Sequence, residues 1–225
     1  MEKAPGTVDC PPSRRKAQRI PFRPKVVAFD CDGVMFDSRE ANRAYYDHLL
    51  ERFHLPAMTP DQLALAHMHT VDEVLLHLIP DASKRETVNA YRRQIGYQPF
   101  LKFMRMEPDL VPLLERLRPR YRTAVATNRT DTMARVLDEN RIGHLFDLVV
   151  CALDVRFPKP HPDALNRVVD HFSVTPAQVI YVGDSHVDES AASSAGVPFV
   201  AFRNPALTAD HHIDHLSEVA GLVGL

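Results

Sequence analysis

The chain has 225 residues, of which 45% are hydrophobic and 25% charged, and its formal net charge at pH 7 is −2. This composition is typical of an ordinary soluble globular protein, and the length suits one large domain or a core with a smaller inserted domain. No stretch approaches the roughly 18 consecutive apolar residues of a membrane span. The sequence therefore argues against a membrane-spanning protein and favours a cytoplasmic one.

Residues 1–24 are a basic tail that also holds five prolines. Residues 1–25 carry seven Lys or Arg against Glu2 and Asp9, so this end has a charge of +5 and the remainder −7. A solvated tail is the commoner form of such a segment, and contact with nucleic acid or an acidic partner is the less expected alternative. The tail has no continuous apolar stretch, which argues against a signal peptide.

The first expected strand is the apolar run Val26–Phe29, and two carboxylates, Asp30 and Asp32, follow it directly. An Asp at the carboxyl end of a parallel strand can act as a nucleophile on phosphorus. An acid two positions later can project to the same side and manage a proton. Gly33 lets the chain leave the strand without a side chain in the way. Alone, this pair is weak evidence, because paired acids also occur in ordinary loops.

A helical insertion is expected after this strand, because about eighty residues precede the next one and a crossover needs far fewer. Capping boxes predict its helix starts at Thr59–Gln62, Thr70–Glu73 and Ser83–Glu86, and the pair Asp37–Glu40 resembles the same device. We expect a compact helical cap over residues 39–103. The segment before Arg39 and the seam Met104–Pro108 would then be its hinges.

The rest of the chain alternates short apolar runs with amphipathic helices. Strands are expected at Thr123–Ala126, Leu148–Cys151, Val179–Val182 and Phe199–Phe202, and helices at Asp109–Arg118, Met133–Asn140, Asp163–Phe172 and Glu189–Ala195. This alternation predicts an α/β fold with a doubly wound parallel sheet, built from residues 25–38 and 104–225. His211, His212 and His215 follow the last expected strand and are interpreted as a solvated turn rather than a metal site.

The three cysteines are Cys10, Cys31 and Cys151, an odd number that fits buried free thiols better than a disulfide framework. A nucleophilic Cys31 is the sharper alternative. It is disfavoured, because the acids on either side would raise its pKa and suppress the thiolate.

Polar residues follow each of the expected strands. Thr127 and Asn128 follow the second, Lys159 precedes a helix, and Asp184 and Asp188 follow the fourth. Ligands bind beyond the carboxyl ends of the strands in such a sheet. Thr127 and Lys159 can supply the hydroxyl donor and the fixed cation that a phosphate needs. Thr127 and Asn128 can equally cap a helix that begins near Asp131.

A divalent cation is the second ligand that these residues suit. Asp30, the backbone carbonyl of Asp32, and Asp184 make a partial shell of oxygen ligands of the kind that Mg²⁺ prefers. The metal would offset the repulsion between a carboxylate nucleophile and an anionic substrate.

These motifs, in this order and each after a strand, resemble the four motifs of the haloacid dehalogenase superfamily. They are Asp30-x-Asp32-Gly33-Val34, Thr127-Asn128, Lys159-Pro160 and Gly183-Asp184-Ser185-x-x-Asp188. The resemblance covers about Lys25 to Phe202, and the insertion resembles the C1 cap of that family. Asp37-Ser38 and Lys159–Asp163 are most similar to its phosphoglycolate phosphatase and β-phosphoglucomutase branch.

The resemblance implies a role for each residue. Asp30 would form an aspartyl-phosphate, and Asp32 would protonate the leaving alcohol and then activate water. The phosphoryl oxygens and the metal would be held by the remaining residues: Thr127, Asn128 and Lys159 for the phosphate, and Asp184 together with Asp30 and Asp32 for Mg²⁺. Asp188 would steady that site without binding the metal, through a hydrogen bond to a metal-bound water or to Lys159.

The expected function is a Mg²⁺-dependent phosphatase that acts on a small phosphorylated metabolite. A phosphomutase shares every core residue and differs only in keeping water away until an acceptor hydroxyl arrives. A non-catalytic binding protein is a third alternative, which the crowded acids disfavour. A dehalogenase needs neither Asp32 nor the metal site, and a phosphonatase needs a cap lysine, for which neither Lys84 nor Lys102 is clearly placed.

Substrate choice is expected to lie in the cap, where no residue is diagnostic. His67 and His69 are at most weak contacts to substrate, and Phe100 and Phe103 are expected to pack the seam between cap and core. The sequence is silent on the oligomeric state.

Overall fold

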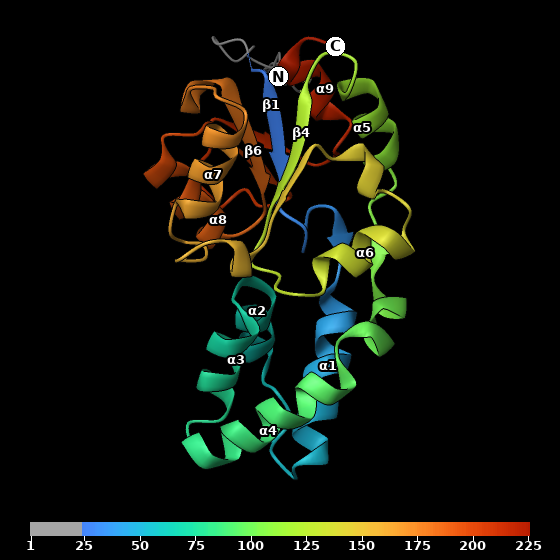
Figure 1. Ribbon diagram of the computed structural model, residues 1–225, viewed down its shortest axis with the longest axis vertical. Coiled ribbons are helices and arrows are strands. Elements are labelled where there is room, and N and C mark those ends of the chain that lie inside the picture. Colours follow the sequence, from blue (N-terminus) through green and yellow to red (C-terminus); the bar gives the residue numbers. More distant parts are fainter. Residues whose placement is uncertain (1–23) are drawn as a thin grey trace, which may run out of the picture.

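A single parallel sheet of six strands organises the computed structural model, which describes residues 24–225 (Figure 1). The strand order is β5-β4-β1-β6-β7-β8, and every neighbouring pair is parallel. The strands are β1 (Val26–Phe29), β4 (Arg122–Ala126), β5 (Leu148–Val150), β6 (Val179–Gly183), β7 (Phe199–Phe202) and β8 (His211–Ile213). The predicted doubly wound α/β fold is confirmed. The predicted basic tail, with Cys10, lies outside the described residues.

Helices cover both faces of this sheet. They are α5 (Leu110–Leu117), α6 (Met133–Glu139) and α9 (Glu218–Val223) on one side, and α7 (Asp163–His171) and α8 (His186–Ala195) on the other (Figure 1). Short 3₁₀ turns at Gly143–Leu145, Ala152–Asp154 and Pro176–Gln178 join them.

Alternate residues of β1 enter two different apolar clusters. Val27 and Phe29 pack with the residues of α5, α6 and α9, whereas Val26 and Ala28 pack with those of α7 and α8. All four side chains are fully buried. This is why the strand reads as a continuous apolar run: both of its faces are covered by helices. The polar residues that follow it lie at the carboxyl ends of the strands, facing the inserted helices.

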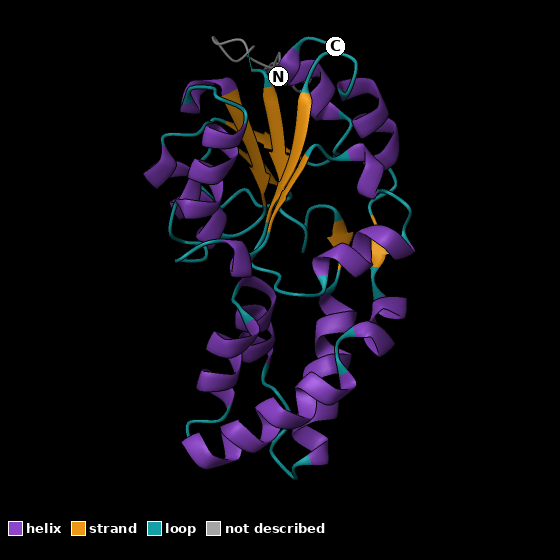
Figure 2. Ribbon diagram, viewed as in Figure 1, coloured by secondary structure: helices purple, strands orange, loops and turns teal. Residues whose placement is uncertain are grey.

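The segment between β1 and β4 is mostly helical, as predicted (Figure 2). It contains α1 (Arg39–Arg52), α2 (Pro60–Met68), α3 (Val71–Leu78), α4 (Ala82–Ile95) and a 3₁₀ helix (Gln98–Phe103). A two-stranded antiparallel sheet, β2 (Phe36–Asp37) with β3 (Arg105–Met106), lies at its root. The helices share an apolar cluster that includes Tyr45, Leu49 and Leu75. The exact limits of a core and a cap domain stay a prediction.

Two of the predicted helix starts are confirmed, since Thr59–Gln62 and Thr70–Glu73 both form reciprocal capping boxes. The predicted box at Ser83 is wrong: Asp81 is the N-cap of α4, and its carboxylate accepts from the Lys84 N–H at 3.0 Å. For α1 the N-cap is Ser38, while Asp37 accepts from the Arg39 N–H at 3.2 Å.

Three further expectations differ from the structure. Residues His211–Ile213 form β8 rather than a solvated turn, because they pair with β7, and His212 bonds to the Leu207 carbonyl. Helix α8 begins at His186, three residues early, because a Ser185–Asp188 capping box starts it there. Phe100 is buried among the inserted helices, but Phe103 is 42% exposed and does not pack the seam.

Cys31 is buried and Cys151 half-buried, and both are free thiols. Among the described residues, no helix combines the length and the apolar character that crossing a membrane requires.

Candidate active site

The predicted site residues meet at one edge of the sheet. Because β1 lies between β4 and β6, Asp30 at the end of β1 has Thr127 on one side and Asp184 on the other. The Asp30 N–H continues the ladder to the Val182 carbonyl at 2.9 Å. Lys159 arrives from the loop between β5 and α7. Convergence at the carboxyl ends of the strands is what the fold requires of a ligand site.

Lys159 is the most buried cation of the site, with 1% of its residue exposed. Its Nζ lies 2.6 Å from Oδ1 of Asp188 and 2.9 Å from Oδ1 of Asp30, and it donates to the Tyr181 hydroxyl at 2.7 Å. Burial acts to lower the pKa of Lys159, but Asp188 and Asp30 outweigh it, so the pKa lies above its ordinary value. The charged form of the ammonium is therefore favoured beside Asp30.

Tyr181 contacts the candidate site residues Lys159 and Asp188, although it was not predicted to do so from the sequence. It stands in the middle of β6 and is fully buried. Its hydroxyl lies 2.7 Å from Oδ1 of Asp188 and 2.9 Å from the Ala126 carbonyl, besides accepting from Lys159. The only sequence feature that could have indicated this role is a tyrosine within an otherwise aliphatic strand, since a buried phenol needs a polar partner.

Asp188 is held by protein groups through both oxygens. Oδ1 bonds to Lys159 and Tyr181, and Oδ2 accepts from the backbone and side chain of Ser185. Burial acts to raise its pKa, but Lys159 outweighs this effect and the pKa is lowered. Gly183 allows this approach, because a Cβ there would lie 2.4 Å from the Asp188 Cβ. With both oxygens in use, Asp188 suits a supporting role.

Asp30, Asp184 and Asp188 form a cluster in which one carboxylate oxygen of each lies within 4.8 Å of the others. Oδ1 of Asp30 is buried with no hydrogen bond of good geometry, and among the described residues none donates to the Asp184 carboxylate. Burial raises the pKa of Asp30 to about 7, although the nearby Lys159 acts to lower it. Burial also raises the pKa of Asp184 well above its usual value. Crowded, under-satisfied oxygen donors of this kind fit a divalent cation.

Gly33 is needed where the chain turns beneath Asp184. Its φ is +83°, and a Cβ at this position would lie 2.1 Å from Oδ2 of Asp184. Any other residue would strain the backbone and clash with that carboxylate.

The Asp32 carboxylate does not join this cluster, because it is turned toward Arg129. Nη2 of Arg129 donates to Oδ1 of Asp32 at 2.7 Å, and both side chains are largely buried. Burial acts to raise the pKa of Asp32, but Arg129 outweighs it and the pKa is lowered. Arg129 could not be recognised as a site residue from the sequence, although it directly follows Thr127 and Asn128.

Thr127 and Asn128 do not cap a helix, since α6 begins at Met133 with Thr132 as N-cap. The Thr127 hydroxyl accepts from the Arg129 N–H at 3.2 Å. The Asn128 amide accepts from the Lys159 N–H and donates to the Lys159 and Met68 carbonyls. Asn128 thereby ties the Lys159 loop to α2 of the insertion.

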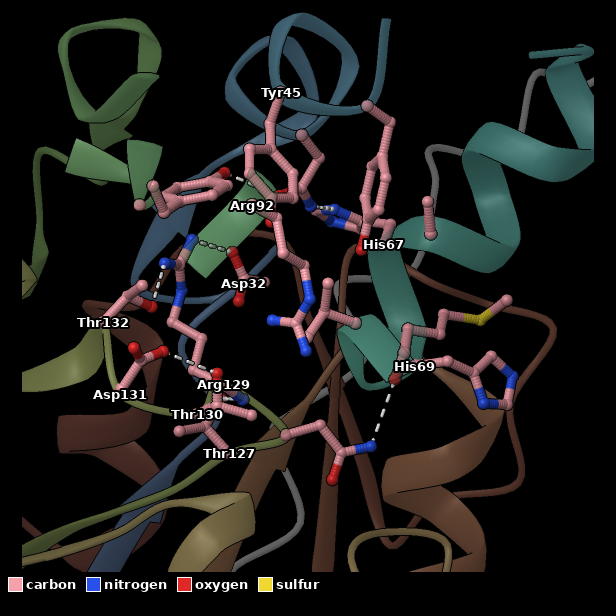
Figure 3. Close-up of a pocket in the computed structure, with 18 of the residues that line it drawn as sticks. Asp32, Tyr45, His67, His69, Arg92, Thr127, Arg129, Thr130, Asp131 and Thr132 are labelled. Carbon is pink, nitrogen blue, oxygen red and sulfur yellow. Dashed lines mark hydrogen bonds and ion pairs between the residues drawn. The ribbon is translucent and has the colours of Figure 1, made fainter. Parts of the chain in front are cut away.

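A cavity of about 150 Å³ lies between this edge of the sheet and the inserted helices (Figure 3). Asp30, Asp32 and Thr127 line it from the sheet. From the insertion it is lined by Tyr45, His67, His69, Arg92 and Tyr97, among others. His67 is half-buried, and the loss of solvent around its ring lowers its pKa; the ring forms a hydrogen bond with Asn42 at 3.3 Å. The sequence held no signal for Arg92.

The family model described as haloacid dehalogenase-like hydrolase matches residues 27–202 of the chain. The chain belongs to this family. Its similarity to solved structures agrees: a subfamily IA hydrolase of the superfamily from Geobacter sulfurreducens is 37% identical, with a TM-score of 0.74 over 90% of this chain and 97% of that one. The chain is thus a hydrolase of the haloacid dehalogenase type.

Curated relatives of this hydrolase carry the name phosphoglycolate phosphatase. The protein from Aliivibrio fischeri is 29% identical over 189 residues, which cover 76% of this chain and 81% of the relative. That from Escherichia coli K12 is 28% identical over 202 residues, 77% and 79% of the two chains. A Bacillus subtilis family member crystallised with magnesium shares the fold, at 19% identity and a TM-score of 0.70 over 91% of this chain and all of that one.

Proposed function

We propose that this chain, a phosphatase of the haloacid dehalogenase family distantly related to the phosphoglycolate phosphatases, hydrolyses a small phosphomonoester through an aspartyl-phosphate on Asp30. The observation that carries the proposal is the position of Asp30 between the Lys159 ammonium and the Asp184 carboxylate, in the wall of the cavity. A nucleophile of this kind needs a fixed cation beside it and a phosphate in front of it.

In the first step, an oxygen of Asp30 attacks phosphorus, and the bond between phosphorus and the alcohol oxygen breaks. Asp32, two residues away, would give its proton to the leaving alkoxide, which requires the protonated form that the Arg129 ion pair disfavours before substrate binds. The phosphoryl oxygens would be held by Lys159, the Thr127 hydroxyl and the backbone at Asn128. Lys159 keeps its charge throughout, because Asp188 and Tyr181 hold it in place.

In the second step, Asp32 takes a proton from water, whose oxygen attacks phosphorus. The bond from phosphorus to Asp30 breaks, so phosphate leaves and the carboxylate is restored. The ion pair with Arg129 suits this step, because it favours the ionised form of Asp32 that accepts a proton.

The oxygens of Asp30, the backbone carbonyl of Asp32 and Asp184 would hold Mg²⁺. The ion would supply positive charge that keeps Asp30 ionised and offsets the charge of an incoming phosphate. Asp188 supports this site through Lys159 and Ser185 rather than as a ligand.

The cavity limits the size of the substrate. Its volume of about 150 Å³ is below the roughly 300 Å³ at which pockets for drug-sized ligands begin. A phosphoryl group with a short carbon chain is therefore favoured over a nucleotide.

The test is release of inorganic phosphate from a panel of small phosphomonoesters in the presence of Mg²⁺. Asp30→Asn should lower kcat roughly a thousandfold or more, because it removes the attacking oxygen. Asp170→Asn, an exposed acid on α7, is the matched control and should keep full activity. Retained turnover in Asp30→Asn would contradict the mechanism. Conversion of β-glucose 1-phosphate to glucose 6-phosphate without phosphate release would select the phosphomutase instead.

A further inference from the structure

The direction of the Asp32 carboxylate suits a group that serves the leaving oxygen. When Asp30 attacks phosphorus, the leaving oxygen lies on the far side of phosphorus, because the attacking and leaving oxygens are roughly in line. An acid that protonates the leaving oxygen must therefore stand apart from the nucleophile. Asp32 meets this condition: it lines the cavity, but its carboxylate is paired with Arg129 and not with the cluster of Asp30 and Asp184.

The contact with Arg129 involves only one oxygen of Asp32. Nη2 of Arg129 donates to Oδ1 at 2.7 Å, and none of the guanidinium nitrogens donates to Oδ2. The side chains of Arg129 and Asp32 are 6% and 13% exposed, so solvent competes little for this bond. The pair therefore fixes the direction of the carboxylate without using both of its oxygens.

Arg129 is itself fixed by several groups (Figure 3). Nη1 donates to the Thr132 hydroxyl at 3.1 Å, and Nη2 also lies 3.4 Å from the Met104 sulfur. The Tyr97 ring centroid lies 5.0 Å from the guanidinium carbon, and the Tyr97 hydroxyl donates to Asn42 on α1 at 2.6 Å. Because these contacts hold the planar fork from different sides, Arg129 can set the position of a partner.

We propose that Arg129 is a positioning residue that directs Asp32 toward the leaving oxygen of the substrate. The inference rests on the proposed phosphatase function and deepens it, since it says what orients the proton donor in the first step. That step is unchanged: the proton moves from Asp32 to the alcohol oxygen as the bond from this oxygen to phosphorus breaks. Without the guanidinium the carboxylate could rotate, and a displacement of about 1 Å is enough to cost on the order of a hundredfold in rate.

The test compares two substrates of nearly the same size, ethyl phosphate and acetyl phosphate. Ethoxide needs a proton as it leaves, whereas acetate leaves as a stable anion and needs none. The measured quantity is kcat/KM for each substrate, which reports the barrier to breaking the bond to the leaving group. In Arg129→Met, kcat/KM should fall at least about tenfold for ethyl phosphate and less than about twofold for acetyl phosphate.

Two further variants test whether Arg129 acts through Asp32. In an Asp32→Asn background, Arg129→Met should leave the ratio of the two kcat/KM values unchanged, because the group that it positions is already lost. Arg129→Lys keeps a cation beside Asp32 but loses the fork to Thr132, so its effect should have the same direction and be smaller. Arg129→Lys carries the test if Arg129→Met does not fold.

Arg135→Met is the matched control. Arg135 stands on α6, is exposed, donates to Gln98 of the inserted segment and does not line the cavity. The variant removes the same kind of group and another contact between the core and the insertion, and it should leave both kcat/KM values unchanged. Because the ratio compares two substrates on one protein, a general loss of folded enzyme does not alter it.

The outcomes separate this inference from the proposed function. An equal fall for the two substrates in Arg129→Met, or a rise for ethyl phosphate, would overturn the positioning role and leave the phosphatase standing. Turnover of acetyl phosphate alone by the unaltered protein would overturn it as well, because no proton donor would then be in place. No Mg²⁺-dependent phosphate release from acetyl phosphate, or release that persists in Asp30→Asn, would count against the proposed function itself.

Discussion

At the scale of single residues, the candidate site depends on side chains that position other side chains by hydrogen bonds. Lys159 contacts Asp30, but its position is set by Asp188 and Tyr181, whose oxygens lie 2.6 and 2.7 Å from Nζ. Tyr181 on β6 and Asp188 on α8 thus hold Lys159, and Lys159 in turn contacts Asp30 at the end of β1. Lys159 and Asp188 could be predicted from their motifs, whereas Tyr181 looks like one more core residue of its strand.

Tyr181→Phe should lower both stability and kcat. The variant leaves a buried ammonium and the Ala126 carbonyl without one partner each, at a cost of about 1–3 kcal/mol in the free energy of unfolding. We expect kcat to fall severalfold with little change in KM, since Lys159 is then less firmly placed. Chemical denaturation and steady-state kinetics measure the two effects.

Tyr121→Phe is the matched control. It removes a tyrosine hydroxyl that donates to the Val223 carbonyl at 2.6 Å, away from the active-site cavity. It should lower stability by about 1 kcal/mol without changing kcat. If Tyr181→Phe also kept full kcat, its hydroxyl would have only a structural role.

At the scale of elements, helix starts decide how the insertion is arranged. Three serine or threonine boxes could be read from the sequence, and two of them form. At α4 two acceptable signals stand close together, Asp81 followed by Lys84 and Ser83 followed by Glu86. Local sequence does not choose between them, because both side chains are good N-caps. The chain starts the helix at the earlier one.

Asp81→Ala should therefore lower the thermal midpoint of the protein, and Ser83→Ala should not. The Asp81 carboxylate accepts from the Lys84 N–H, which also lowers its pKa, and this bond is lost in the first variant only. Differential scanning calorimetry of the two variants compares the caps directly. Equal losses in both would mean that the helix shifts its start to whichever cap remains.

At the scale of the whole molecule, the acidic cluster makes stability depend on pH and metal. The pKa of Asp30 is about 7 in the folded protein against 3.8 as the reference for the unfolded chain. Between these values the folded state holds a proton that the unfolded state has lost, so the stability of the metal-free protein falls as pH rises through this interval. Asp32 and Asp188, whose pKa values are lowered, lose their stabilising effect only below about 3.8.

Asp184→Asn should raise the thermal midpoint of the metal-free protein at pH 8 and change it little at pH 4. The substitution removes a charge that crowds Asp30, and both carboxyls are neutral in the folded state at the lower pH. Between pH 4 and pH 8, the free energy of unfolding should accordingly fall less in the variant than in the unaltered protein, by up to a few kcal/mol.

Added Mg²⁺ should reverse the order of the two proteins at pH 8, because only the unaltered cluster binds it well. Thermal scans in EDTA and in excess Mg²⁺ measure both effects, with Asp170→Asn as the control. A variant that is less stable than the unaltered protein in EDTA at pH 8 would contradict the crowding argument.

Sequence patterns alone predicted the strands β1, β4, β5, β6 and β7, the helical character of the insertion, and a shared location for the candidate site residues Asp30, Asp32, Thr127, Asn128, Lys159, Asp184 and Asp188. Apolar runs and helical periodicity are local properties, and the rule that strand ends share an edge then brings their following residues together. Family resemblance gave these residues their expected roles.

Which side chains face one another across that site depends on the tertiary packing and could not be predicted from the sequence. Asp32 and Arg129 are 97 positions apart, and their ion pair exists because β1 and β4 are neighbours. The same holds for β8, whose polar sequence becomes a strand only because β7 offers it an edge. It holds also for Arg92, which faces the cavity because the inserted helices fold back over the end of the sheet. Such contacts depend on how the elements are packed, and a sequence pattern of a few residues carries no record of that packing.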